Sequence, residues 1–442
     1  MLSVLTVSWL LLIVLVTYIQ VVRVGDKRKQ LKIRLNLWYL SFLLYALFGL
    51  GCTVEYLFFG NTGITNRWTL RVLTRNNVCT FSFLWLIGAF TFVIGSIIAV
   101  TSFRRKTTYQ PVPVNQMSQR DLILAVHLAF LIFLFSAIHM DAFQVSLNRT
   151  AAMWSGYEAS MHRIDLPYKA FFIIYFTLTL FLGENLRNRA QKKLFYIHLS
   201  ICIAFAGFYL FVQGGRLVAI QLLFTYIAFK TLKNKTFSLR GFIIFGVILV
   251  GGALAIYQWR GQIMALLLGR QIQWFPQGRL SLLEGDGGIA MYVTNKCMEG
   301  LQYPPFLNFI IYIIPRFLWH SKPDPLSVAF NRAYGAEGGF GIPMVAAGIV
   351  NFGVYLCFLQ TFIAGCLTGL LDSLKYSRSR LAIILYVSSG SLFFYAVIAD
   401  LGQFLAQIIW RLITISLILG CVKLIKMGRI TAYRSETLQH EY

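Results

Sequence analysis

Lysine and arginine side chains recur along residues 258–341, a long segment that is neither an apolar span nor a short basic linker. The distribution of charge in the other loops places this segment outside the cytoplasm, where Lys and Arg are normally scarce. Guanidinium and ammonium groups kept on that side point to an anionic ligand. The cations of the segment are Arg260, Arg270, Arg279, Lys296, Arg316, Lys322 and Arg332.

Arg216 has a local sequence suited to anion binding, because it follows Gly214 and Gly215 and opens a predicted span. Paired glycines let a backbone turn approach a ligand, and free N–H groups at a helix start favour anions. A guanidinium adds a planar fork that binds phosphate through two parallel hydrogen bonds. The alternative is an arginine that reaches toward lipid headgroups.

Three further cations, Arg279, Arg316 and Lys322, extend this pattern, since each lies beside Gly or Pro. Taken alone, each also fits a solvated surface charge. Together with Arg216 they predict a phosphate or diphosphate site.

Arg411 lies about ten residues into the last predicted span. An unpaired cation there would cost about 2.5–3.5 kcal/mol, so we expect it to face protein or water. Spacings of three, four and four residues place a polar stripe on one helical face, made of Asp400, Gln403, Gln407 and Arg411. The stripe predicts a polar wall that runs inward from the outer surface. The alternatives are a buried ion pair or a polar seam between two helices.

Candidates for a catalytic base are few. His320 is the only histidine of residues 258–341, and the carboxylates there are Glu284, Asp286, Glu299, Asp324 and Glu337. Residues 60–78 contain no acidic pair, which weighs against a metal held by carboxylates. Cysteines without CxxC or His-paired spacing predict neither a disulfide framework nor a metal site. Cys79 and Cys297 both fall on the predicted outer side, where two free thiols are the simpler expectation than a pair.

These side chains must be positioned by membrane helices. Hydrophobic residues make up 57% of the 442 and charged residues 13%, and the mean hydropathy is +0.67. Several apolar runs reach the ~20 residues that a bilayer core requires. The sequence therefore predicts an all-α polytopic membrane protein with eleven spans, at 2–22, 35–59, 79–103, 121–140, 167–185, 194–213, 217–232, 239–257, 342–371, 381–400 and 402–422.

The orientation follows from short basic loops, which hold 25 of the 40 lysines and arginines. Cytoplasmic loops of membrane proteins carry such an excess, so the N-terminus is predicted outside and the C-terminus inside. The same clustering explains the net charge of +24 without a nucleic-acid partner.

Three regions result: residues 1–257 with eight spans, a large outer loop at 258–341, and residues 342–442 with three spans and a cytoplasmic tail. Within the loop, residues 304–319 are apolar for too few residues to span, which predicts an interfacial or re-entrant helix. Residues 260–274 place arginines among Leu, Ile and Trp, as in an amphipathic helix on the outer leaflet. Together these two helices would form a lid over an outward-facing cavity.

Several short motifs resemble those of the O-antigen polymerase family, the oligosaccharide repeat-unit polymerases related to O-antigen ligases. The motifs are Gly214-Gly215-Arg216, Gly278-Arg279-Leu280, Ile314-Pro315-Arg316-Phe317-Leu318-Trp319-His320-Ser321-Lys322-Pro323 and Asn351-Phe352-Gly353. A set of about eleven spans with one large outer loop late in the chain also fits this family.

The resemblance implies a metal-independent glycosyltransferase without a cofactor, at the periplasmic face of the bacterial inner membrane. Its donor and acceptor would both be oligosaccharides linked to undecaprenyl diphosphate, and its partners would include membrane lipid and a chain-length-regulating co-polymerase. Arg216 and Arg279 would grip the donor diphosphate, and His320 would serve as the general base. The other candidates for substrate binding are Arg316, Lys322, Arg411, Asp400 and Glu337.

Two other functions stay open. An O-antigen ligase would transfer the finished chain to a lipid A core sugar, and only the acceptor distinguishes the two reactions. A transporter or flippase of lipid-linked oligosaccharide would show internal repeats and broken helices in both halves, and the sequence predicts neither.

Overall fold

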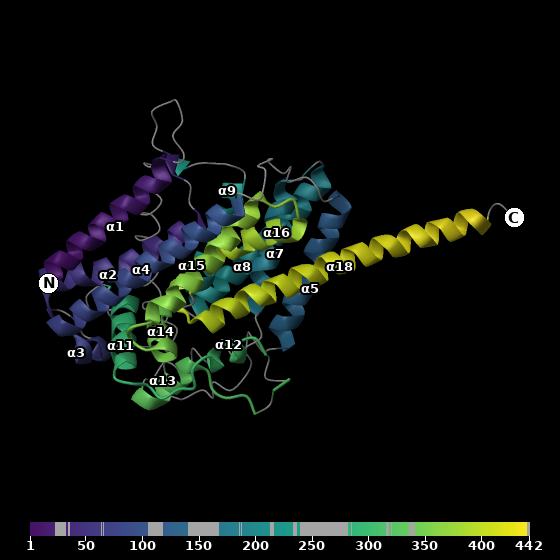
Figure 1. Cartoon of the computed structure of the whole chain (residues 1–442). Coiled ribbons are helices and arrows are strands. Elements are labelled where there is room, and N and C mark those ends of the chain that lie inside the picture. The colour runs from purple at the N-terminus through teal and green to yellow at the C-terminus, as the bar shows by residue number, and fades with distance from the viewer. Residues whose placement is uncertain are drawn as a thin grey trace, which may run out of the picture. The chain divides into compact units, whose positions relative to one another are not determined.

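The computed structural model contains helices almost throughout the part of the chain that it describes (Figure 1). Within the described residues, the two-residue strands β1 (Lys32–Ile33) and β2 (Phe237–Ser238) pair as a short antiparallel ladder. The described residues are 1–22, 32–33, 36–62, 64, 66–104, 118–139, 168–184, 186, 188–212, 216–232, 237–238, 282–283, 285–314, 318–319, 321–335 and 341–439.

The helices are divided between two compact units. The first contains α1 (Leu2–Val22), α2 (Leu37–Phe59), α3 (Arg67–Val72), α4 (Arg75–Arg104), α11 (Asp286–Met298), α12 (Leu307–Ile311), α13 (Leu326–Tyr334), α14 (Met344–Phe352), α15 (Cys357–Ser373) and α17 (Tyr395–Ile398). The second contains α5 (Gln119–His139), α7 (Tyr168–Glu184), α8 (Arg189–Val212), most of α9 (Arg216–Leu232), η2 (Leu374–Tyr376) and α16 (Arg380–Ser389). Helix α18 (Leu401–Gln439), yellow in Figure 1, begins in the first unit and continues in the second.

Six described helices are long and apolar enough to cross a membrane. They cover Leu2–Gln20, Leu37–Phe59, Arg75–Phe103, Gln119–Ile138, Cys357–Tyr376 and Leu401–Gly428. Large apolar side chains are exposed along α1, among them Val4, Val7, Leu11 and Val14, as expected for a surface that faces lipid. The protein is therefore an α-helical, multi-pass membrane protein, as the composition predicted.

The predicted span at 342–371 is wrong as a single helix. Helix α14 ends at Phe352, and Gly353 then takes a positive φ of 78°, a conformation that glycine adopts without strain. The chain turns back, so that the Nε2 atom of Gln360 on α15 donates to the carbonyl oxygen of Met344 at the start of α14 (3.3 Å). Residues 344–373 thus form a helical hairpin with one short arm.

The predicted span at 381–400 is also interrupted. Helix α16 ends at Ser389, a 3-10 turn covers Gly390–Phe393, and α17 contains only four residues. Serine side chains at the break bond to nearby carbonyl groups: Ser388 to Leu385 (3.1 Å) and Ser391 to Ser388 (2.9 Å). Such local bonds compete with the regular helical ladder, which accounts for the irregular segment.

The core of the first unit lies where α4 packs along α15 and α2. Gly365 permits the close approach of α15, because a Cβ atom there would collide with the carbonyl of Phe92. Ser96 donates to the carbonyl oxygen of Gly365 across the same contact (3.0 Å). The buried Asp372 accepts from the backbone N–H groups of Leu37 and Trp38, at 2.9 Å each, so the end of α15 caps the start of α2.

Candidate functional site

Arg411 is fully buried in the second unit. Its Nη1 atom donates to the carbonyl oxygen and to Oε1 of Gln407, at 2.9 and 3.0 Å, and its Nη2 atom donates to Ser391 Oγ at 2.8 Å. Burial among protein groups agrees with the expectation that this cation avoids lipid. Ser391 belongs to the irregular segment after α16. The break in that helix therefore contacts the buried guanidinium of Arg411.

Asp400 caps the start of α18. Its carboxylate is 2% exposed, and Oδ1 accepts from the backbone N–H of Gln403 at 2.9 Å. Eleven residues of helix rise about 16 Å, so Asp400 and Arg411 are too far apart along α18 for the ion pair that the sequence left open. Their hydrogen bonds belong to different units.

Lys322 is a buried cation, 7% exposed, at one end of the Pro315-to-Pro323 motif. Its Nζ atom donates to the carbonyl oxygen of Ile314 at 2.9 Å. The two ends of the motif are thus held together across eight residues. This position gives Lys322 a structural contact that the sequence did not predict, since it was expected to face a substrate.

Two asparagines anchor the chain around this motif. Asn351 Oδ1 accepts from the backbone N–H of Phe306 (3.2 Å), while its Nδ2 atom donates to Gln360 Oε1 (2.8 Å). The buried Asn308 accepts from the N–H of Leu326, the first residue of α13 (3.1 Å). The Asn351-Phe352-Gly353 motif therefore joins the chain around Phe306 to the α14–α15 hairpin.

Tyr303 adds a further tie at the start of this segment. Its hydroxyl donates to the carbonyl oxygen of Asp324 (3.2 Å). Burial, with the nearby charges of Asp400 and Asp324, raises the pKa of Tyr303, so the hydroxyl keeps its proton. The Asp324 carboxylate in turn pairs with Arg332 at 2.7 Å.

Glu55 is a functional candidate that the sequence reading missed. Its Oε2 atom accepts from the backbone N–H groups of Leu282 (2.9 Å) and Leu283 (3.2 Å), just after the Gly278-Arg279-Leu280 motif. The Leu282 side chain fits against Gly51, one turn earlier on α2, where a Cβ would collide with it. Glu55 is the only charged residue of α2. A single acid in an apolar span is the sequence signal that could have identified it.

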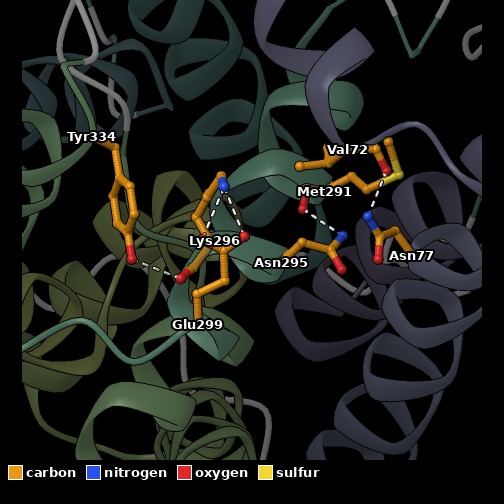
Figure 2. A network of polar contacts seen from close by, with 7 residues as sticks. All are labelled: Val72, Asn77, Met291, Asn295, Lys296, Glu299 and Tyr334. Atoms are coloured by element: carbon orange, nitrogen blue, oxygen red, sulfur yellow. Dashed lines mark hydrogen bonds and ion pairs between the residues drawn. The ribbon is translucent and has the colours of Figure 1, made fainter.

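The chain after Arg279 and the chain after Lys322 meet where α11 contacts α13. Figure 2 shows the Tyr334 hydroxyl donating to the carbonyl oxygen of Lys296 (2.9 Å), next to the ion pair of Lys296 with Glu299 (2.7 Å). The rings of Tyr292 and Phe330 lie edge to face, with centroids 6.2 Å apart. These contacts join the C-terminal halves of α11 and α13, the helices that follow the two basic motifs.

Arg216 is the first residue of α9, as predicted from Gly214 and Gly215. Its side chain lies outside the described residues, as do Arg279, Arg316, His320, Glu284 and Glu337, the predicted span at 239–257 and the predicted helix at 260–274. Residues 304–319 contain the short helix α12, of five residues, which is too short to span.

Cys79 and Cys297 are both buried free thiols. Within the described ranges, no group of three or more His, Cys, Asp or Glu side chains is placed to hold a metal ion. The chain matches no protein-family model, no curated protein and no solved structure.

Proposed function

We propose that this protein is a glycosyltransferase that polymerises oligosaccharide repeat units linked to undecaprenyl diphosphate. The reaction would take place at the periplasmic face of a bacterial inner membrane and build O-antigen or a related surface polysaccharide. In this proposal the chain has about eleven spans, its N-terminus and residues 258–341 face the periplasm, and its C-terminus faces the cytoplasm.

The observation that supports the proposal most is the contact between α11 and α13. Arg279 precedes α11, and Arg316 and Lys322 precede α13, so the contact between these two helices supports a common site for the two basic motifs. Glu55 and Lys322 fix the chain on either side, through the bonds to Leu282 and to Ile314. In this proposal the cations of both motifs bind one diphosphate, whose charge needs preorganised donors.

The chemistry then requires little beyond position and charge. An acceptor hydroxyl oxygen forms a bond to the anomeric carbon of the donor sugar, and the bond from that carbon to the diphosphate oxygen breaks. The diphosphate leaves with the electron pair, and arginines stabilise the charge that develops on it. The hydroxyl proton passes to a base, for which His320 is the candidate.

A reconstituted assay tests the proposal. Purified protein in liposomes, given undecaprenyl diphosphate-linked repeat units and a metal chelator, should produce a ladder of polymer lengths. Arg216→Lys and Arg279→Lys should each lower turnover by a factor on the order of 10² to 10³, because Lys keeps the charge but loses the fork. Arg332→Lys, an exposed arginine already paired with Asp324, is the matched control and should retain wild-type turnover. A wild-type protein that makes no polymer under these conditions would refute the assignment.

A transporter or flippase of the same lipid-linked substrate is the second candidate, and the interrupted helices favour it. Discontinuous helices line substrate sites in many transporters, and the hairpin at Gly353 and the break at Gly390 are of this kind. Liposomes that move a fluorescent lipid-linked repeat unit across the bilayer without extending it would select transport. Chain extension without such movement selects the polymerase.

A further inference from the structure

The connection between α2 and α4 is strongly basic. It carries Arg67, Arg71 and Arg75, all exposed, and residues 60–78 contain no aspartate or glutamate. No ion pair joins Arg71 or Arg75 to an acid within the part of the chain that the structure describes. Like charges gathered in this way repel one another, so the arrangement favours an anion from outside the chain.

Trp68 organises two of these arginines. The guanidinium carbons of Arg67 and Arg71 each lie 4.7 Å from the centroid of the Trp68 ring. The indole itself is 8% exposed and packs on Tyr292 of α11, with centroids 5.4 Å apart. A guanidinium stacked on a ring directs the N–H donors of its edge away from the ring, so Trp68 holds both guanidinium groups on a fixed base.

Hydrogen bonds in the turn from α3 to α4 fix the backbone positions of Arg71 and Arg75 relative to each other. The carbonyl oxygen of Val72 accepts from the N–H of Thr74 (2.8 Å) and from Nδ2 of Asn77 (3.0 Å), the second of which appears in Figure 2. Thr74 Oγ1 accepts from the N–H of Asn77 (3.2 Å) and so caps α4. Arg75 is therefore a cation in the first turn of a 30-residue helix, where the helix dipole disfavours it. A bound anion would remove that cost.

Helix α3 also contacts the chain that follows Arg279. A Cβ atom on Gly288 would meet the Thr69 Oγ1 atom at 2.5 Å and would collide with the carbonyl of Leu283. Thr69 and Leu283 thus both lie close to the α-carbon of Gly288, and Leu283 follows Arg279 by four residues. The arginines of α3 therefore belong to the same part of the first unit as the end of the proposed donor motif.

A polymerase of lipid-linked repeat units must hold two lipid diphosphates at once, one on the donor and one on the acceptor. We infer that Arg67 and Arg71, which stack on Trp68, and Arg75, at the start of α4, bind the diphosphate of the acceptor lipid. This inference rests on the proposed function and adds a second anion site to it, separate in sequence from Arg216 and Arg279.

Lipid binding and acceptor kinetics together test the inference. The full-length protein is placed in nanodiscs of phosphatidylethanolamine, and bound undecaprenyl diphosphate is counted by native mass spectrometry. Wild type should bind two molecules per chain, and the double variant Arg71→Gln/Arg75→Gln should bind one. In the polymerisation assay, the same variant should raise the KM for the acceptor by roughly 10- to 100-fold, the scale of a lost charge-assisted hydrogen bond. Its turnover at saturating acceptor should stay near wild type, and Lys426→Gln, which removes an exposed cation of α18 near Asp121, should change neither measurement.

The results that would contradict the proposed function differ from those that would contradict the acceptor site alone. Wild type that binds no undecaprenyl diphosphate and makes no polymer refutes the proposed function together with this inference. Wild type that polymerises but binds one molecule, or a double variant that still binds two with an unchanged acceptor KM, refutes the acceptor site alone. Nanodiscs containing phosphatidylglycerol provide the last arm: if this lipid displaces the second molecule, the arginines bind ordinary phospholipid headgroups and the inference fails.

Discussion

The Nζ atom of Lys322 lies 2.9 Å from the carbonyl oxygen of Ile314, so a buried ammonium closes the loop that carries Arg316 and His320. A charged donor in that position fixes the ends of the loop more strongly than a neutral one would. We therefore expect that this bond also positions the motif.

Replacement of Lys322 tests this. Lys322→Met keeps the length of the side chain but leaves the Ile314 carbonyl without its charged donor, at a cost of about 1.5–3 kcal/mol. We expect a lower melting temperature and a large loss of polymer, whereas Lys296→Met, in a half-buried ion pair, should change both only slightly. Wild-type thermal stability of Lys322→Met would show that the bond contributes nothing to the fold.

Substitutions of Glu55 test in steps how much its bonds to the chain after the Gly278-Arg279-Leu280 motif contribute. Glu55→Gln retains one acceptor oxygen for Leu282 and Leu283, whereas Glu55→Leu retains none. Polymer output should therefore fall in the order wild type, Gln, Leu, with the Leu variant losing about 1–3 kcal/mol of stability. Glu299→Gln, at an exposed carboxylate that caps the end of α11, is the control. Equal output from Glu55→Leu and wild type would remove Glu55 from the site.

Arg411→Leu separates a catalytic contribution from a structural one. Leu has a volume close to that of Arg and removes the cost of a buried charge, and the partners left behind on Gln407 and Ser391 are neutral, so the variant should accumulate in membranes. We expect it to lose chain extension, while Ser391→Ala, which removes one neutral acceptor, should lose much less. If Arg411→Leu makes a normal ladder, this face of α18 is only a seam between helices.

Topology is the most direct test of the orientation. Reporter fusions after Lys106, Lys193 and Lys235 should report the cytoplasm, and a fusion near Gly285 should report the periplasm, because basic loops are retained inside. A cytoplasmic signal at Gly285 contradicts the site, since Arg279, Lys322 and the arginines of α3 would then face the wrong compartment.

The sequence predicted the membrane class because hydropathy depends on composition, and it predicted the burial of Arg411 because lipid excludes charge. The breaks at Gly353 and Gly390 were missed, since α14 and α15, like the segments on either side of Gly390, are apolar enough to look continuous. The sequence identified Asn351 as part of a motif but predicted no role for its side chain, and it did not identify Glu55. Their roles depend on backbone groups of Phe306 and Leu282, residues distant in sequence that no local pattern brings together.

The hairpin at Gly353 also bears on how the protein is made. Helix α14 has nine residues, which rise about 13 Å, less than half of the ~30 Å hydrocarbon core. Such a segment has no stable place in lipid when it leaves the ribosome, because its last carbonyl groups would end within the bilayer without partners. Insertion of α14 must therefore wait for α15, whose Gln360 bonds to Asn351 and to the Met344 carbonyl. We therefore expect the two arms to enter the membrane as one unit, and a chain that stops between them to remain uninserted at α14.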